Sequence, residues 1–84
     1  MKGIEKTDVE KLPAKVRALY DVLSESYPLP VAINVIQRVA GYRYSARLYE
    51  LRKRLLYPAG WDVMVFHPKG YGGNFRAYKM VRIV

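Results

Sequence analysis

The first half of the chain carries apolar side chains at the spacing of an α-helix. Pro13 is a residue type favoured at the first position of a helix, and the positions after it follow the i, i+3, i+4, i+7 rule. These apolar positions are Val16, Leu19, Tyr20, Leu23 and Tyr27. Pro28 and Pro30 then remove backbone donors and push the residues before them into extended geometry. The pattern predicts a first helix that ends before these prolines, with Leu29 as a stub of strand.

A second apolar run follows Pro30 and ends at Gly41, a residue type that suits a left-handed helix stop. A third helix is predicted three residues later, from Ser45, which is available as its N-cap, to about Leu56. At about 100° per residue its apolar positions fall on one side. These positions are Tyr44, Leu48, Leu51 and Leu55. The opposite face of this helix is polar and mostly basic.

The periodicity changes from helical to alternating after Gly60. Residues 61–67 alternate as they do in a strand, and a second run from Phe75 to Val84 is rich in strand formers. Residues 68–74 lie between the two runs and are predicted to form a hairpin loop. Residues 1–10 are polar and read as a charged arm with a hint of a helical turn. The predicted fold class is therefore α+β, with three helices followed by a β-hairpin in one domain over residues 11–84.

Length and composition narrow the function classes. A chain of 84 residues forms one small domain with a thin core, which leaves little room for a catalytic cleft. The absence of Cys excludes disulfides, thiolate catalysis and cysteine-based metal sites. His67 is a lone histidine, and Glu50 with Asp62 does not make a nuclease centre, which needs several converging carboxylates. We therefore expect no enzymatic activity, no metal and no cofactor.

Targeting signals are not evident in the sequence. No stretch approaches about 18 uncharged apolar residues, the length of a membrane-spanning helix. The N-terminus lacks the apolar run of a signal peptide. We expect a soluble protein of the host cytoplasm or nucleoid, with no membrane partner and no small-molecule ligand.

The positive charge is concentrated in the second half of the chain. The 15 Lys and Arg residues outnumber the seven Asp and Glu residues and give a formal net charge of +8. Residues 1–37 are balanced, so the whole excess lies in residues 38–84. Such asymmetry indicates a surface that faces a polyanion, although a generally basic soluble protein would have the same composition.

The predicted order of elements resembles the winged-helix family. Two short helices joined by a tight glycine-containing turn form a helix-turn-helix, and a hairpin placed directly after it is the wing. Within residues 29–66, the segment from Arg38 to Lys53 is similar to the helix-turn-helix of small phage and prokaryotic proteins. The shared pattern is a glycine, a short turn, and then Ser45, Ala46, Arg47, Leu48, Tyr49, Glu50, Leu51, Arg52 and Lys53. The segment from Arg54 to Gly60 is longer than the usual connection between this helix and the wing.

This resemblance implies a protein that binds double-stranded DNA with its third helix in the major groove. Such a protein would act as a transcriptional regulator or as an architectural factor of the excisionase type. The DNA-binding positions on and beside the helix would be Arg38, Arg43, Tyr44, Ser45, Ala46, Arg47, Tyr49, Arg52, Lys53 and Arg54. Ser45, Ala46 and Tyr49 are the expected base-edge contacts, and the arginines are expected to hold phosphates. The wing would add Lys69, Tyr71, Asn74 and Arg76.

Several alternatives stay open at this point. The basic helix face is also compatible with simple solvation, in which Glu50 pairs with Lys53 or Arg54, and the wing loop with an ordinary hairpin loop. The same surface would suit an RNA-binding or ribosome-associated winged helix. A third alternative is a protein-interaction module that binds the transcription machinery. A homodimer is compatible with an apolar rim, for which the candidates are Leu29, Val31, Ile83 and Val84.

Overall fold

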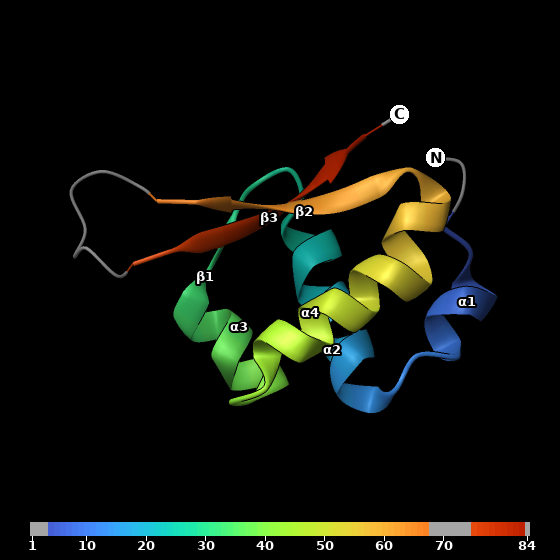
Figure 1. Cartoon of the computed structure of the whole chain (residues 1–84), viewed down its shortest axis with the longest axis horizontal. Helices are drawn as coiled ribbons and strands as arrows, with labels where there is room; N and C mark the ends of the chain where they lie inside the picture. Colours follow the sequence, from blue (N-terminus) through green and yellow to red (C-terminus); the bar gives the residue numbers. More distant parts are fainter. Residues whose placement is uncertain (1–3, 68–74, 84) are drawn as a thin grey trace.

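The computed structural model describes residues 4–67 and 75–83 and has α+β architecture (Figure 1). The helices gather on one side of a small antiparallel sheet. The α-helices are α1 (Lys6–Glu10), α2 (Ala14–Ser26), α3 (Ile33–Ala40) and α4 (Tyr44–Leu51). The strands are β1 (Val31–Ala32), β2 (Trp61–Phe66) and β3 (Ala77–Arg82). The expected α+β class is confirmed, but the prediction of three helices is wrong for the described residues, since the N-terminal segment also forms a helix.

The N-terminal segment packs against the rest of the domain. Helix α1 lies within residues 1–10, and the partly buried side chains of Ile4 and Val9 contact the hydrophobic core. Leu12, which directly follows, is 6% exposed. These three apolar side chains are separated by charged residues, so their spacing gave only a weak helical signal.

The sheet has the strand order β1-β3-β2, and both pairs are antiparallel. In the hairpin, Val63 lies opposite Met80 and Val65 lies opposite Tyr78. Strand β1 pairs Val31 with Tyr78, so the predicted stub of strand falls two residues after Leu29. The N–H of Ile33 at the start of α3 also donates to the carbonyl of Arg76 at 2.8 Å. Tertiary pairing with β3 therefore decides where this strand lies, because so short a segment has little preference of its own.

A tight turn joins α3 to α4. Gly41 ends α3 with φ of 79°, and its N–H donates to the carbonyl of Gln37 at 2.7 Å. Helix α4 begins at Tyr44, with Arg43 at the N-cap position and no side-chain cap. The expectation that Ser45 caps this helix is therefore wrong. Ser45 lies inside the first turn, because the carbonyl of Arg43 already accepts the first helical hydrogen bond from Arg47 at 3.1 Å.

Helix α4 continues into a π-helical turn, η1 (Arg52–Leu56), and then a 3-10 turn, η2 (Tyr57–Ala59). The wider π turn brings residues five apart onto one face. Leu51 and Leu56, which are five residues apart, are both fully buried, and Leu55 is 4% exposed. Gly60 ends the run with φ of 83°. The long connection noted in the sequence is thus helical and buries an extra leucine that a regular α-helix would point elsewhere.

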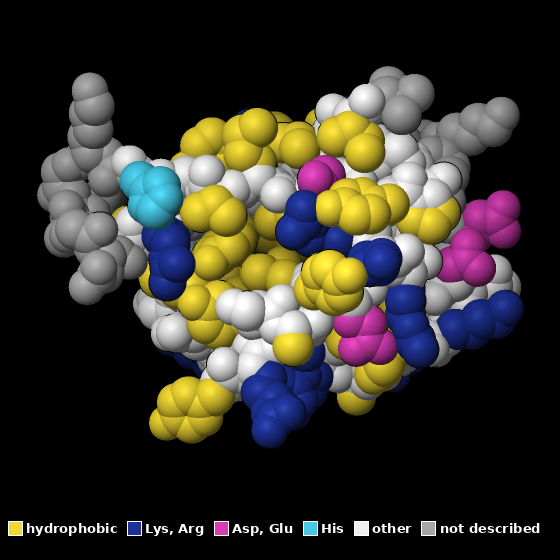
Figure 2. All heavy atoms as spheres, viewed as in Figure 1, with side chains coloured by type: hydrophobic (Ala, Val, Ile, Leu, Met, Phe, Trp, Pro, Cys, Tyr) yellow, Lys and Arg dark blue, Asp and Glu magenta, His cyan; other side chains and the backbone are white. Residues whose placement is uncertain are grey.

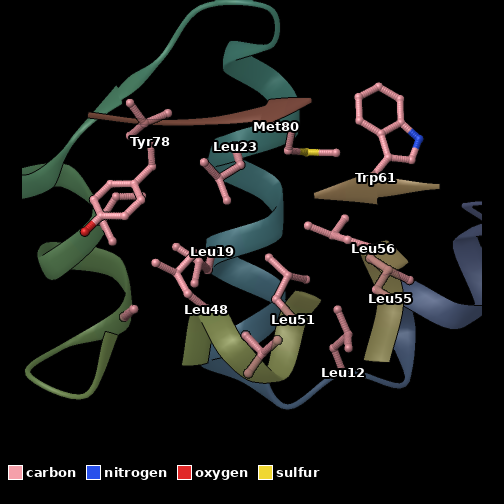
Figure 3. Close-up of a cluster of buried hydrophobic side chains, with 14 residues drawn as sticks. Leu12, Leu19, Leu23, Leu48, Leu51, Leu55, Leu56, Trp61, Tyr78 and Met80 are labelled. Atoms are coloured by element: carbon pink, nitrogen blue, oxygen red, sulfur yellow. The ribbon is translucent and has the colours of Figure 1, made fainter. Parts of the chain in front are cut away.

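The hydrophobic core lies between α2, α4 and the sheet (Figure 3). Leu19 and Leu23 on α2 are fully buried, and they face Leu51 on α4 and Leu56 on η1. The strands close the layer with buried side chains of Val31, Trp61, Tyr78 and Met80. Val31 is 5% exposed, so its expected place in an apolar surface rim is wrong, because pairing with β3 turns it into the core.

Candidate nucleic-acid interface

The exposed face of α4 carries the side chains that the sequence predicted for base contacts. Ser45, Ala46 and Tyr49 are exposed, and 58% of Tyr49 is accessible. They lie on the side opposite Leu48 and Leu51, which pack into the core. The structure therefore brings these three predicted positions together on one accessible helix face.

Cationic side chains lie along one border of this face. Arg38 at the end of α3 and Arg43 in the turn are exposed, Arg47 is half-buried, and Lys53 and Arg54 follow on η1. The ammonium of Lys53 lies 5.3 Å from the centre of the Tyr49 ring, which is a cation–π contact. Figure 2 shows Lys and Arg side chains along α4 and below the α3–α4 turn, while hydrophobic side chains line the hollow between α4 and the hairpin. The basic groups thus form the lower border of this face.

Acidic partners are scarce on this side of the molecule. In the described ranges, residues 4–67 and 75–83, two ion pairs lie within 4.0 Å. Glu50 pairs with Arg54 at 3.4 Å, and Asp62 pairs with Arg52 at 2.6 Å. Both acidic residues of the second half are therefore used within the domain. Arg38, Arg43, Arg47 and Lys53 have no ion-pair partner among the described residues.

Arg52, one of the predicted DNA contacts, is held in an internal network. Its Nε donates to Asp62 Oδ1 at 2.6 Å and its guanidinium also donates to the hydroxyl of Tyr57. The hydrogen bond to Asp62 raises the pKa of Arg52 above its ordinary value. Asp62 Oδ1 further accepts the N–H of Val63 at 2.7 Å. This network ties the helical turns that continue α4, η1 and η2, to the edge strand β2.

Tyr44, the first residue of α4, contacts Arg76, which directly precedes β3. Nη2 of Arg76 donates to the hydroxyl of Tyr44 at 3.3 Å, and the Tyr44 ring packs edge-on against Tyr78 at 6.4 Å. Burial raises the pKa of Tyr78 above its ordinary value, and the nearby Tyr44 raises it further. Both predicted side chains are half-buried, so they join α4 to β3 as well as bordering the exposed face. The remaining predicted wing positions, Lys69, Tyr71 and Asn74, lie outside the described residues.

The turn between α3 and α4 carries a feature that the sequence prediction missed. Tyr42 is fully exposed, with a relative accessibility of 103%. It borders an open hollow of about 330 Å³ whose other lining residues are Gln37, Arg38 and Gly41. The signal available in the sequence was an aromatic residue placed directly between the turn glycine and Arg43.

Other kinds of site were not found in the described part of the chain. No group of three or more His, Cys, Asp or Glu residues there could hold a metal ion. None of the described helices is long and apolar enough to cross a membrane. No protein-family model, curated protein or solved structure matches this chain.

Proposed function

We propose that this α+β domain is a winged helix and that it binds double-stranded DNA. Helix α3, the turn at Gly41 and helix α4 would be the helix-turn-helix, and the β2–β3 hairpin would be the wing. The proposal is supported by the order of the elements, by the strand order β1-β3-β2 and by the way α4 presents one face to solvent. Its biological role would be that of a transcriptional regulator or an architectural factor.

The observation that carries the proposal is the set of cations without acidic partners. Arg38 lies at the end of α3, Arg43 in the turn, Arg47 on α4 and Lys53 on η1, while both nearby carboxylates are already engaged. Charges of one sign that repel one another are stabilised by an opposite charge from outside, and DNA offers closely spaced phosphates. The four groups frame a face whose central side chains are polar or small enough to approach base edges.

Each part of the face would then have its own task. Arg43 and Arg47, which are four residues apart and so lie on the same side of α4, would contact phosphates on one side of the groove and fix the register of α4. Ser45, Ala46 and Tyr49 would meet the base edges. Arg52 would act indirectly, because its bond to Asp62 fixes the angle between α4 and the hairpin.

The test is a fluorescence-anisotropy titration of a labelled random-sequence duplex across a range of salt concentrations. A protein that neutralises about five phosphates gives a slope of log affinity against log salt near −4 to −5. Replacing both Arg43 and Arg47 by Ala is expected to weaken binding and to make the slope shallower by about 2.

A matched control removes the same charge elsewhere. Lys11 and Lys15 are exposed and lie near the start of α2, outside the α3–α4 segment, so Lys11→Ala with Lys15→Ala lowers the net charge equally. The control is expected to change the salt slope by less than half as much. Equal losses in the two double variants would mean that net charge, rather than this face, governs binding.

The competing RNA hypothesis is tested in the same assay with duplex RNA of the same sequence. A-form RNA has a narrow major groove that does not admit a helix, so tighter binding to DNA is expected. Tighter binding to RNA, or no binding to either duplex at low salt, would overturn the proposed function.

A further inference from the structure

The hollow at the α3–α4 turn combines three chemical groups that a single nucleotide also requires. Tyr42 offers an aromatic face, the amide of Gln37 offers a donor and an acceptor, and Arg38 offers a guanidinium. None of the lining residues is acidic, and no ion pair within the described ranges involves Arg38. An anionic ligand with a flat ring matches this set better than a cation or an aliphatic group does.

The ring of Tyr42 lies entirely in solvent. Aromatic rings usually gain stability by burial, and a tyrosine can bury about 150–250 Å². Tyr42 buries none of this area, since its accessibility is 103%. The other tyrosines near α4 have partners: Tyr44 packs on Tyr78, and Tyr49 lies under Lys53. Tyr42 thus leaves its ring open for a ligand.

The hollow is open to solvent and has room for a small ligand. Its volume is about 330 Å³, which lies within the range of small-molecule sites. At Gly41, an added Cβ would meet nothing within 4 Å, so the side of the turn is open to approach. A base with its phosphate fits such a site, with the base against the ring and the phosphate near the guanidinium.

We propose that Tyr42, Gln37 and Arg38 hold one unpaired nucleotide of a DNA strand, with its base stacked on Tyr42. This inference rests on the proposed function, because the bases of an intact duplex are already stacked on one another and are not available to the ring. The protein would therefore prefer a duplex that continues into a single-stranded end or gap over a fully paired duplex.

The experiment compares three labelled DNAs by anisotropy: a blunt duplex, the same duplex with a short single-stranded tail of either polarity, and the single strand alone. Stacking of a base on an aromatic side chain changes binding by about fivefold or more. We expect the better tailed duplex to bind wild-type protein at least about fivefold more tightly than the blunt one.

Two substitutions at Tyr42 distinguish an effect of the aromatic ring from an effect of side-chain size. Tyr42→Leu keeps an apolar side chain and is expected to abolish the preference for the tail without changing affinity for the blunt duplex. Tyr42→Phe keeps the ring and is expected to retain the preference. Tyr49→Leu, which alters another exposed tyrosine, should weaken binding to the blunt duplex and to the tailed duplex by the same factor.

Failure of this inference differs from failure of the proposed function. A tail that adds nothing in wild-type protein, or a preference that persists in Tyr42→Leu, would overturn the nucleotide site while duplex binding stands. If the blunt duplex is not bound but the single strand is bound through Tyr42, the nucleotide site stands and the duplex proposal is overturned.

Discussion

Replacing Asp62 with Asn removes one negative charge from the link between η1 and the hairpin and leaves the shape of the side chain almost unchanged. Oδ1 of Asp62 accepts a hydrogen bond from Nε of Arg52 at 2.6 Å, and Oδ2 accepts one from Nη2 of Arg52 at 3.4 Å. An asparagine oxygen would still accept the N–H of Val63, now at 2.7 Å from Oδ1. The substitution therefore isolates the charge-assisted part of the network.

The expected loss follows from the partial burial of this pair. A hydrogen bond to a charged group contributes about 1.5–3 kcal/mol, whereas an exposed ion pair contributes about 0–1 kcal/mol. The Arg52 and Asp62 side chains are 36% and 25% exposed, which places the pair between these limits. We expect Asp62→Asn to lower the free energy of unfolding by about 1.5 kcal/mol. With a urea m-value near 1 kcal/mol/M for a small domain, the midpoint would fall by about 1.5 M.

Urea denaturation measures this loss through two probes. The single tryptophan, Trp61, is 3% exposed and reports unfolding by fluorescence, and far-UV circular dichroism reports the helices independently. The matched control is Glu50→Gln, which removes the carboxylate that pairs with Arg54 at 3.4 Å on a more exposed surface. That variant should lose about 0.3–0.5 kcal/mol. Equal midpoint shifts in the two variants would refute the conclusion that the Arg52 network joins the helix to the hairpin.

Three further predictions concern the fold itself. Gly41→Ala should lower the free energy of unfolding in urea by about 1–3 kcal/mol, because φ of 79° with ψ of −166° is a conformation that only glycine adopts readily. Gly60→Ala, at φ of 83° and ψ of 28°, should lower it less. The reverse order of the two losses would contradict this account. Leu51→Ala should cost about 2–5 kcal/mol, since this side chain is fully buried, and a loss under about 1 kcal/mol would show that its site collapses around the smaller residue. Burial raises the pKa of Tyr78 above its ordinary value of 10.0, so the neutral phenol is favoured in the folded state, and its stabilising contribution is complete below that value and is lost as the pH rises through the folded pKa. Tyr78→Phe should therefore show a smaller fall of the urea midpoint above pH 10.0 than wild type, and an unchanged pH profile would contradict this assignment.

The sequence by itself determined the helices that have a clear apolar period and a clear stop. The spacing of Val16, Leu19 and Leu23 located α2, and Gly41 ended α3, because a positive φ strongly favours glycine. The alternation after Gly60 located the hairpin strands. The excess of positive charge in residues 38–84 also came from the sequence alone, and so did the candidate base contacts on one face of α4.

Tertiary structure decided the features that depend on contacts between distant segments. Val31 became a buried strand residue because β3 offers it hydrogen bonds, and the short α1 forms where Ile4 and Val9 meet the core. The π turn formed where Leu55 and Leu56 could both be buried.

The same distinction applies to the charged surface. A list of basic residues does not tell which of them are free, since that depends on where each carboxylate lies after folding. Asp62 on β2 forms an ion pair with Arg52, whereas Arg38 and Arg43 have no acidic partner among the described residues. Helix formation depends on interactions between residues close in the sequence, so the local pattern predicts it. The pairing of charges and of strands depends on residues far apart in the sequence, so it is determined only when the chain folds around its core.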